Sequence, residues 1–208
     1  MRIIKAIYII LILLIERLKG IMERIQGLDI SNSESLGKLN LNSERSVHYV
    51  SSGNKYLDNV MQSFKITSED SIIDVGCGKG GALITMSKYP FASLCGVELS
   101  YRLCNIAKMN MNRLGIENVK IYCSDASEFT DYYKYNYIYF FNPFPSVVMN
   151  LVMQNVINDL QINPRKVVII YKNPVCHEDI INNSIFFKIQ EFPHEGRTKF
   201  FVYSNTVG

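Results

Sequence analysis

The fold of this chain is decided by residues 71–81, which read SIIDVGCGKGG. A short apolar run stops at the carboxylate of Asp74, and four glycines follow before Ala82. Glycine permits a tight turn and a close approach of the backbone to a ligand, and the first N–H groups of a following helix point at the same place. This stretch therefore predicts a buried strand, a ligand-binding turn and a helix in direct succession.

Outward from this stretch, apolar runs alternate with segments of helical periodicity, which predicts a mostly parallel sheet with helices on both faces. After Asn183, the runs IFFKIQEF and TKFFVYS are separated only by PHEGR, which predicts an antiparallel hairpin at the end of the sheet. The expected strands are 71–74, 93–98, 119–123, 137–141 and 166–171, and the expected helices are 81–88, 100–114, 146–160 and 176–183, after an earlier one near 52–65.

Composition supports one folded domain with an N-terminal extension. The chain has 208 residues, of which 48% are hydrophobic and 12% aromatic, so a sizeable core can form and disorder is excluded. The net charge is only +3, and no basic run stands out. This weak charge gives no support to tight binding of duplex nucleic acid, which requires a basic face to neutralise phosphates.

The five cysteines give no sign of a disulfide framework or a metal site. Their number is odd, no two of them form a CxxC pair, and no Cys/His spacing resembles a zinc site. We therefore expect five small buried thiols in a reducing cytoplasm. The positions are Cys77, Cys95, Cys104, Cys123 and Cys176.

The N-terminus carries an unbroken apolar run, AIYIILILLI at residues 6–15. At about 1.5 Å per residue, this run covers about half of a hydrocarbon core of about 30 Å. The helical pattern continues to Ile25, and Gly27 ends it. Three interpretations remain open: a helix that covers the domain, a helix that binds a partner, and an interfacial helix with peripheral contact through residues 3–25 on the inner face of the membrane.

These patterns predict three parts of the chain. Residues 1–27 form the apolar N-terminal helix, residues 28–45 form a linker rich in serine and asparagine, and residues 46–208 form the domain.

The glycine turn fits two kinds of ligand, and Asp74 distinguishes them. Gly76, Gly78 and Gly81 satisfy the pattern GxGxxG, which is also found where dinucleotides bind. A carboxylate directly before the turn would repel a pyrophosphate, whereas a ligand with a sulfonium and an α-ammonium group would attract it. The stretch therefore favours S-adenosylmethionine over NAD.

Three further strand ends carry polar side chains, and ligands bind at this edge of an open α/β sheet. Glu98 lies about twenty residues after the glycines, where an acid accepts hydrogen bonds from ribose hydroxyls. Asp125 is placed to accept a hydrogen bond from the exocyclic amine of adenine; the alternative is that Asp125 caps the N-terminus of a helix. Asn142 is placed to accept hydrogen bonds from an amine, with Phe144 lining the acceptor pocket and a plain Asn-Pro turn as the alternative.

The chain resembles the class I S-adenosylmethionine-dependent methyltransferase superfamily over residues 45–204, through DVGCGKG, GVELS and SDAS. More narrowly, GCGKG, GVELS, FNPFP and YKNP are similar to a bacterial group that resembles histone-lysine methyltransferases of the disruptor-of-telomeric-silencing type. The resemblance implies a Rossmann-like, three-layer α/β sandwich with a seven-stranded sheet in the order 3-2-1-4-5-7-6. It also implies that His48 and Tyr49 fold over the cofactor, with Tyr49 in contact.

The FNPFP stretch is similar to the (N/D)PP(Y/F) motif of N-methyltransferases, although Phe144 replaces the second proline. The expected transfer site is Asn142, Pro143 and Phe144. His177 follows the second Asn-Pro pair, at Asn173, and is either a general base for a hydroxyl acceptor or a solvated helix start. The expected cofactor contacts are Tyr49, Asp74, Gly76, Cys77, Gly78, Gly80, Glu98, Leu99, Asp125, Ala126 and Asn142, and no metal is expected.

These residues predict an enzyme that transfers a methyl group from S-adenosyl-L-methionine to an acceptor, by preference an amine such as a protein lysine, and leaves S-adenosyl-L-homocysteine. A small molecule, a glycan or a lipid head group are the other acceptors. Two alternatives stay open: an adaptor that binds the cofactor without catalysis, and an NAD-dependent oxidoreductase. The second is disfavoured by Asp74 and by the lack of a Tyr-x-x-x-Lys pair.

Overall fold

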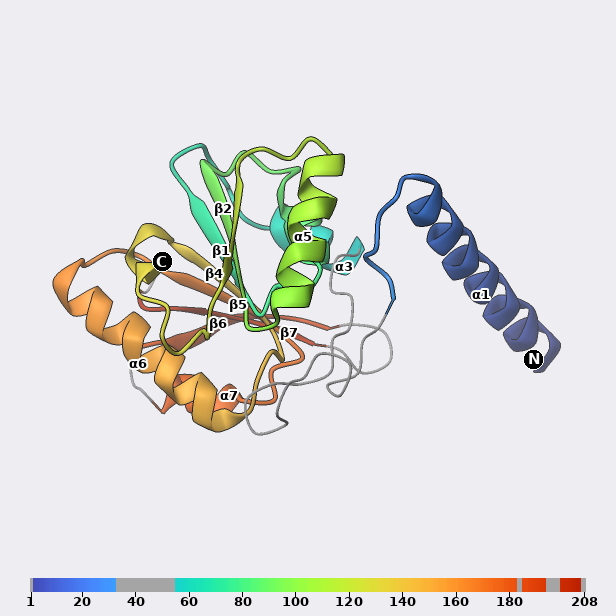
Figure 1. Ribbon diagram of the computed structural model, residues 1–208. Helices are drawn as coiled ribbons and strands as arrows, with labels where there is room; N and C mark the ends of the chain where they lie inside the picture. Colours follow the sequence, from blue (N-terminus) through green and yellow to red (C-terminus); the bar gives the residue numbers. More distant parts are fainter. Residues whose placement is uncertain (1, 33–54, 183–184, 194–198, 207–208) are drawn as a thin grey trace.

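A computed structural model describes residues 2–32, 55–182, 185–193 and 199–206. Seven strands form one sheet in the order β3-β2-β1-β4-β5-β7-β6, with helices on both faces (Figure 1). The expected fold class and strand order are confirmed. The strands are β1 (Ser71–Val75), β2 (Ser93–Glu98), β3 (Val119–Cys123), β4 (Tyr137–Phe141), β5 (Val168–Lys172), β6 (Phe187–Phe192) and β7 (Phe200–Ser204).

The first five strands run parallel, and β1 lies at the centre between β2 and β4. Strand β1 is buried on both faces, as its run of isoleucine and valine requires. In the register, Asp74 lies beside Gly96 on one side and Tyr139 on the other. This arrangement brings the glycine turn, Glu98 and the end of β4 to one edge of the sheet.

Two apolar clusters cover the two faces of the sheet. One face packs against α6 (Ser146–Ile162), α7 (His177–Ile181) and the 3-10 turn η1 (Asp131–Lys134). The other packs against α3 (Lys55–Gln62), α4 (Gly81–Met86) and α5 (Tyr101–Arg113). Figure 1 shows α6 and α5 on opposite sides of the sheet.

The C-terminal strands form the expected antiparallel hairpin. Strand β7 pairs with β5 and β6, so β6 lies at the edge. All but the last residue of β6 are exposed, whereas four of the five residues of β7 are buried. This contrast is what an edge strand and an interior strand require.

Helix α1 (Arg2–Ile25) lies beside the domain, and the side chains described on its apolar face are exposed (Figure 1). Gly27 adopts a φ of 68° directly after the helix, and Leu28 is then 8% exposed. Among the described residues, no helix is long and apolar enough to cross a membrane. The interpretation of α1 as a cover for the domain does not fit these exposed side chains.

The expectation of five free thiols is wrong for one pair. A disulfide joins Cys104 of α5 to Cys123 at the end of β3, with Cα atoms 5.9 Å apart. The register places Glu98 beside Cys123, and α5 begins shortly after β2, so residues 19 apart in the sequence meet. The other three cysteines are buried and free, as expected.

Candidate active site

The glycine turn leaves β1 through three glycines with positive φ. Gly76, Gly78 and Gly80 have φ values of 81°, 54° and 83°, a region that other residues rarely adopt. The N–H groups of Gly76 and Cys77 both donate to the carbonyl of Val97, at 2.8 and 3.0 Å. The turn is therefore fixed against β2, and α4 begins at Gly81, directly after the N-cap residue Gly80.

The first turn packs tightly against the end of β4. A Cβ at Gly76 would collide with the side chain of Pro143. The structure therefore packs Pro143 of the FNPFP stretch against the glycine turn, and only glycine fits at position 76.

Asp74 is 2% exposed, and its Oδ2 accepts no hydrogen bond from any residue that the structure describes. Burial raises its pKa well above the usual value for an aspartate, and the nearby Glu98 raises that pKa further. A buried carboxylate oxygen without a donor is costly, and a cationic hydrogen-bond donor removes that cost. Asp74 therefore fits the ammonium group of an amino-acid ligand such as S-adenosylmethionine.

Glu98 holds the glycine turn in place. Its Oε2 accepts from the N–H of Gly78 at 3.0 Å, and its Oε1 accepts from the N–H of Ser100 at 2.8 Å. Burial raises its pKa, and these backbone hydrogen bonds oppose the rise. Each carboxylate oxygen has a second lone pair, so Glu98 retains acceptor capacity for ribose hydroxyls while it positions the turn.

Asp125 forms a local turn. Its Oδ1 accepts from the N–H of Ser127 at 2.9 Å and from the Ser127 hydroxyl at 2.7 Å. This is the geometry of an Asx turn, and residues 126–130 form no helix, so the helix cap considered for Asp125 from the sequence is not what the structure shows. The adjacent Ala126 is 8% exposed, and Leu99 is 37% exposed directly after β2.

Two Asn-Pro turns lie next to each other at the ends of β4 and β5. Asn142 and Asn173 adopt φ values of 41° and 52°, and they are the two described residues other than glycine with positive φ. The register places Phe141 beside Lys172, so the asparagines that follow are neighbours. Left-handed backbone at such residues is concentrated at functional sites, because it needs surrounding structure to maintain it.

Phe144 lies in the core. It is 5% exposed and packs edge-on against Phe140, with ring centroids 6.1 Å apart. This placement favours a packing role for Phe144, and contact with the acceptor stays a prediction.

Lys172 is a residue at this edge that the sequence patterns did not single out. It is 4% exposed, and its Nζ lies 3.9 Å from the centroid of the Phe141 ring. Burial lowers its pKa to about 8. The available signal was a lysine directly before an Asn-Pro pair at the end of an apolar strand.

A second missed group connects the glycine turn to the segment after α1. The Nζ of Lys79, which is fully buried, lies 2.8 Å from Asp29 Oδ1 and donates to the carbonyl of Asn32 at 2.9 Å. The buried Asn110 donates to the carbonyls of Asp29 and Lys79. No local pattern marks these residues, because they come from three distant parts of the chain.

Three histidine and tyrosine residues that the sequence singled out remain. His48 and Tyr49 lie outside the described residues. His177 begins α7, and its Nδ1 forms a 2.8 Å hydrogen bond with the Tyr203 hydroxyl. His177 thus starts a helix, but it is half-buried against β7 and not solvated as the alternative expected, and its role as a general base stays a prediction.

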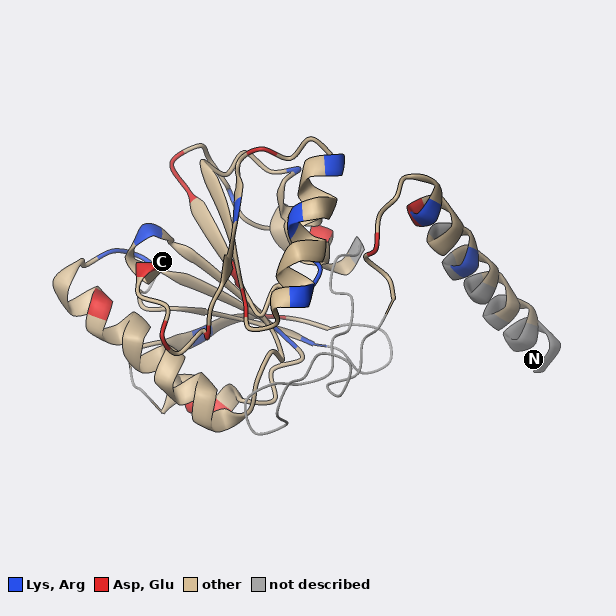
Figure 2. Cartoon of the chain, viewed as in Figure 1, with Lys and Arg blue, Asp and Glu red and all other residues tan. Residues whose placement is uncertain are grey.

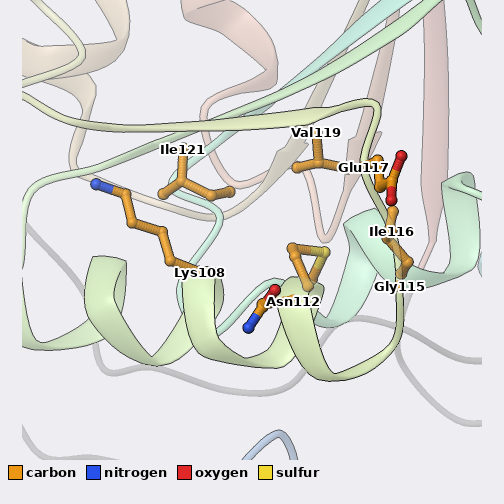
Figure 3. Close-up of a pocket in the computed structure, with 8 residues that line it drawn as sticks. Lys108, Asn112, Gly115, Ile116, Glu117, Val119 and Ile121 are labelled. Carbon is orange, nitrogen blue, oxygen red and sulfur yellow. The ribbon is translucent and has the colours of Figure 1, made fainter.

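A pocket of about 360 Å³ lies elsewhere, at the outer edge of the sheet (Figure 3). Figure 3 shows Lys108 and Asn112 on one helix, with Val119 and Ile121 on the neighbouring strand. Because β3 begins at Val119, this pocket lies at the opposite end of the strands from the glycine turn. It is therefore separate from the candidate active site.

A family model with the description "Putative methyltransferase" matches residues 68–145, which include the glycine turn and the first Asn-Pro turn. The match covers less than half of the chain; with the strand order, it makes the chain similar to class I S-adenosylmethionine-dependent methyltransferases.

Two curated relatives are similar over part of the chain. EEF1A lysine methyltransferase 2 of Homo sapiens is 28% identical over 65 residues, which are 31% of this chain and 28% of that protein. The "Probable cobalt-precorrin-6B C(15)-methyltransferase (decarboxylating)" of Methanococcus maripaludis is 25% identical over 120 residues, which are 56% of this chain and 52% of that protein. The chain therefore spans about a quarter and a half of the length of these relatives.

Among solved structures, an RNA methyltransferase from Salinibacter ruber in complex with S-adenosyl-L-homocysteine matches with a TM-score of 0.55 and 15% identity. The match covers 74% of this chain and 93% of that one. At this identity the likeness supports the fold alone.

Proposed function

We propose that this chain binds S-adenosyl-L-methionine at the carboxyl edge of β1, β2 and β4 and transfers its methyl group to an acceptor. The observation that carries this proposal is the buried Oδ2 of Asp74, which accepts no hydrogen bond from the described residues, directly before three glycines with positive φ. An ammonium donor matches this carboxylate, whereas a pyrophosphate would be repelled by it. The alternative of an NAD-dependent oxidoreductase lacks a comparable observation.

S-adenosylmethionine, when bound, supplies an electrophilic methyl group on a sulfonium. Asp74 accepts a hydrogen bond from the α-ammonium group, and the unused lone pairs of Glu98 accept hydrogen bonds from ribose hydroxyls. Leu99 and Ala126 face the adenine. Pro143, packed against Gly76, fixes the distance between the turn and the acceptor side. Positioning and exclusion of water supply most of the rate of such a displacement, so no covalent enzyme intermediate is needed.

We further propose an amine as the acceptor, with a protein lysine as one case. Asn142 supports this, because its amide oxygen and the neighbouring carbonyl at the end of β4 accept N–H hydrogen bonds and leave the amine lone pair directed at the methyl group. The narrower resemblance to the disruptor-of-telomeric-silencing type rests on the quoted motifs. The human relative named for lysine methylation supports the same choice over 65 residues.

The cofactor is tested by isothermal titration of the full chain with S-adenosylhomocysteine, with NADH as the control ligand. We expect micromolar binding of the first and no binding of the second. Binding of NADH alone would overturn the proposal, since Asp74 would then face a pyrophosphate.

Catalysis is tested separately, because an adaptor without activity would give the same titration. The full chain is incubated with donor labelled at the methyl group and a cell extract, with Asp74→Asn as the matched control. We expect label in an acceptor with the wild type and none with the variant. Tight cofactor binding without any label in acceptor would favour the adaptor.

A further inference from the structure

Helix α1 presents a continuous apolar face that the domain leaves exposed. Nine large apolar side chains on it are between 43% and 74% exposed. They recur three or four residues apart, which places them on one side of a helix. They are Ile7, Ile10, Leu11, Leu14, Ile15, Leu18, Ile21, Met22 and Ile25.

The width of this face distinguishes between two binding partners, a second helix in a coiled coil and a flat apolar surface. Ile7, Leu11, Leu14, Leu18, Ile21 and Ile25 follow the alternating spacing of a coiled-coil seam. Ile10, Ile15 and Met22 flank that seam at positions that a two-stranded coiled coil gives to charged residues. The face is therefore wider than a helix pair requires and suits a flat apolar surface.

The charge of α1 indicates which charge the surface that it binds should carry. Arg2–Ile25 contains five basic and two acidic residues, which leaves 17 of each in the rest of the chain. The whole net charge of +3 thus resides on this helix. The charged residues in its described part, Arg17, Glu23 and Arg24, lie towards the end next to the domain (Figure 2). An apolar face beside a basic one is typical of helices that lie on anionic lipid.

The end of α1 is attached to the domain. The N–H of Leu28 donates to the Glu23 carbonyl at 2.7 Å, and Glu23 Oε2 accepts from the N–H of Ser31 at 3.0 Å. Asp29 then forms its ion pair with Lys79 of the glycine turn. If α1 binds a surface, these contacts therefore keep the domain near that surface, with the glycine turn on the side where α1 is attached.

We propose that α1 lies in the plane of an anionic lipid bilayer, with its apolar face in the acyl region and its basic residues at the head groups. At about 1.5 Å per residue, its 24 residues extend about 36 Å along the surface. This inference is independent of methyl transfer, because it rests on α1 alone.

The test is co-sedimentation of the full chain with vesicles of phosphatidylcholine alone and of phosphatidylcholine mixed with phosphatidylglycerol. We expect binding to the mixed vesicles and weaker binding to the neutral ones. The double variant Arg17→Gln/Arg24→Gln should lose about five-fold in affinity for the mixed vesicles per arginine, and little for the neutral ones.

The apolar face is tested by Leu14→Gln/Leu18→Gln in the full chain, which should lower binding to both vesicles at least ten-fold. The matched control is Val147→Gln/Ile162→Gln, which changes two apolar residues of α6 that are more exposed than Leu14 and Leu18 and should leave binding unchanged. Titration with S-adenosylhomocysteine should be the same for all variants, which separates this result from the proposed cofactor site.

Three results would overturn the proposal. Wild type that stays in the supernatant with anionic vesicles shows that α1 does not bind lipid. Equal loss in the α6 control shows that the effect is unspecific. A lipid-independent dimer that Leu14→Gln/Leu18→Gln dissociates, without vesicle binding, assigns the face to a second copy of the chain.

Discussion

At the scale of single residues, Asp74 combines a cost in stability with its proposed role in binding. Its folded pKa lies well above the value of about 3.9 expected in the unfolded chain, so the folded protein retains a proton that the unfolded one loses. The free energy of unfolding therefore falls as the pH rises above about 4.

We accordingly expect Asp74→Asn to be more stable than the wild type at neutral pH, by about 1.4 kcal/mol for each unit of pKa difference removed. The same change should weaken S-adenosylhomocysteine binding at least ten-fold, because a charged hydrogen bond is lost. Thermal unfolding across pH and titration measure the two effects, with the exposed Glu69→Gln as control. Unchanged ligand affinity would remove Asp74 from the site.

Burial of Lys172 also costs stability, but here the dependence of stability on pH has the opposite sign. Its pKa is lowered to about 8 by burial, so between pH 8 and about 10 the unfolded chain binds more protons than the folded one. The stability of the wild type should therefore rise with pH across that window.

Replacement by Lys172→Met removes this penalty and should stabilise the protein by about 2–3 kcal/mol at pH 7, with little difference above pH 10. Chemical denaturation at several pH values measures this, and the exposed Lys166→Met serves as control. A less stable variant at pH 7 would indicate that the ammonium is compensated in solution.

At Asn142, two substitutions can distinguish the role of the backbone conformation from the role of the side chain. Asn142→Gly keeps a residue that tolerates a φ of 41°, whereas Asn142→Ala does not. We expect both variants to bind S-adenosylhomocysteine and both to lose methyl transfer, with Asn142→Ala less stable by about 1 kcal/mol. Transfer by Asn142→Gly at the wild-type rate would assign Asn142 to the fold alone.

At the scale of elements, the disulfide between α5 and β3 closes a short loop beside Glu98. For a separation of 19 residues, we expect a contribution of about 3 kcal/mol to the free energy of unfolding. Cys104→Ser should lose this amount without reductant, and reductant should bring the wild type to the same value. The control is Cys176→Ser, which removes a free buried thiol. Five titratable thiols in the unfolded, unreduced wild type would contradict the disulfide.

At the scale of the whole molecule, the domain should be independent of α1 but not of the segment after it. A chain shortened by residues 1–26 retains Leu28 and Asp29, so Lys79 keeps its ion pair. We expect this chain to be soluble, to bind S-adenosylhomocysteine as the full chain does, and to unfold within about 0.5 kcal/mol of it.

A chain shortened by residues 1–32 leaves the buried Lys79 ammonium without Asp29 and should lose about 3 kcal/mol. Denaturation of both chains measures the difference. Equal stability of the two would mean that the Asp29–Lys79 pair contributes nothing, and aggregation of the longer one would make α1 part of the core.

The sequence by itself determined the sheet, its hairpin and the order of polar strand ends. Strand and helix periodicity, glycine spacing and turn residues are local signals, so Asp74, Glu98 and Asn142 could be assigned to one edge before any coordinates. The observed strands differ from those expected by at most two residues at either end.

Only the tertiary structure decided what those residues contact. The Glu98 carboxylate reaches the N–H of Gly78 because parallel pairing sets β2 against β1. The pairing of β2 with β3 brings Cys123 to Cys104. Lys79 meets Asp29 across 50 positions, and α1 leaves its apolar face exposed. Such contacts depend on how distant segments pack, and no periodicity within a short window of sequence records that.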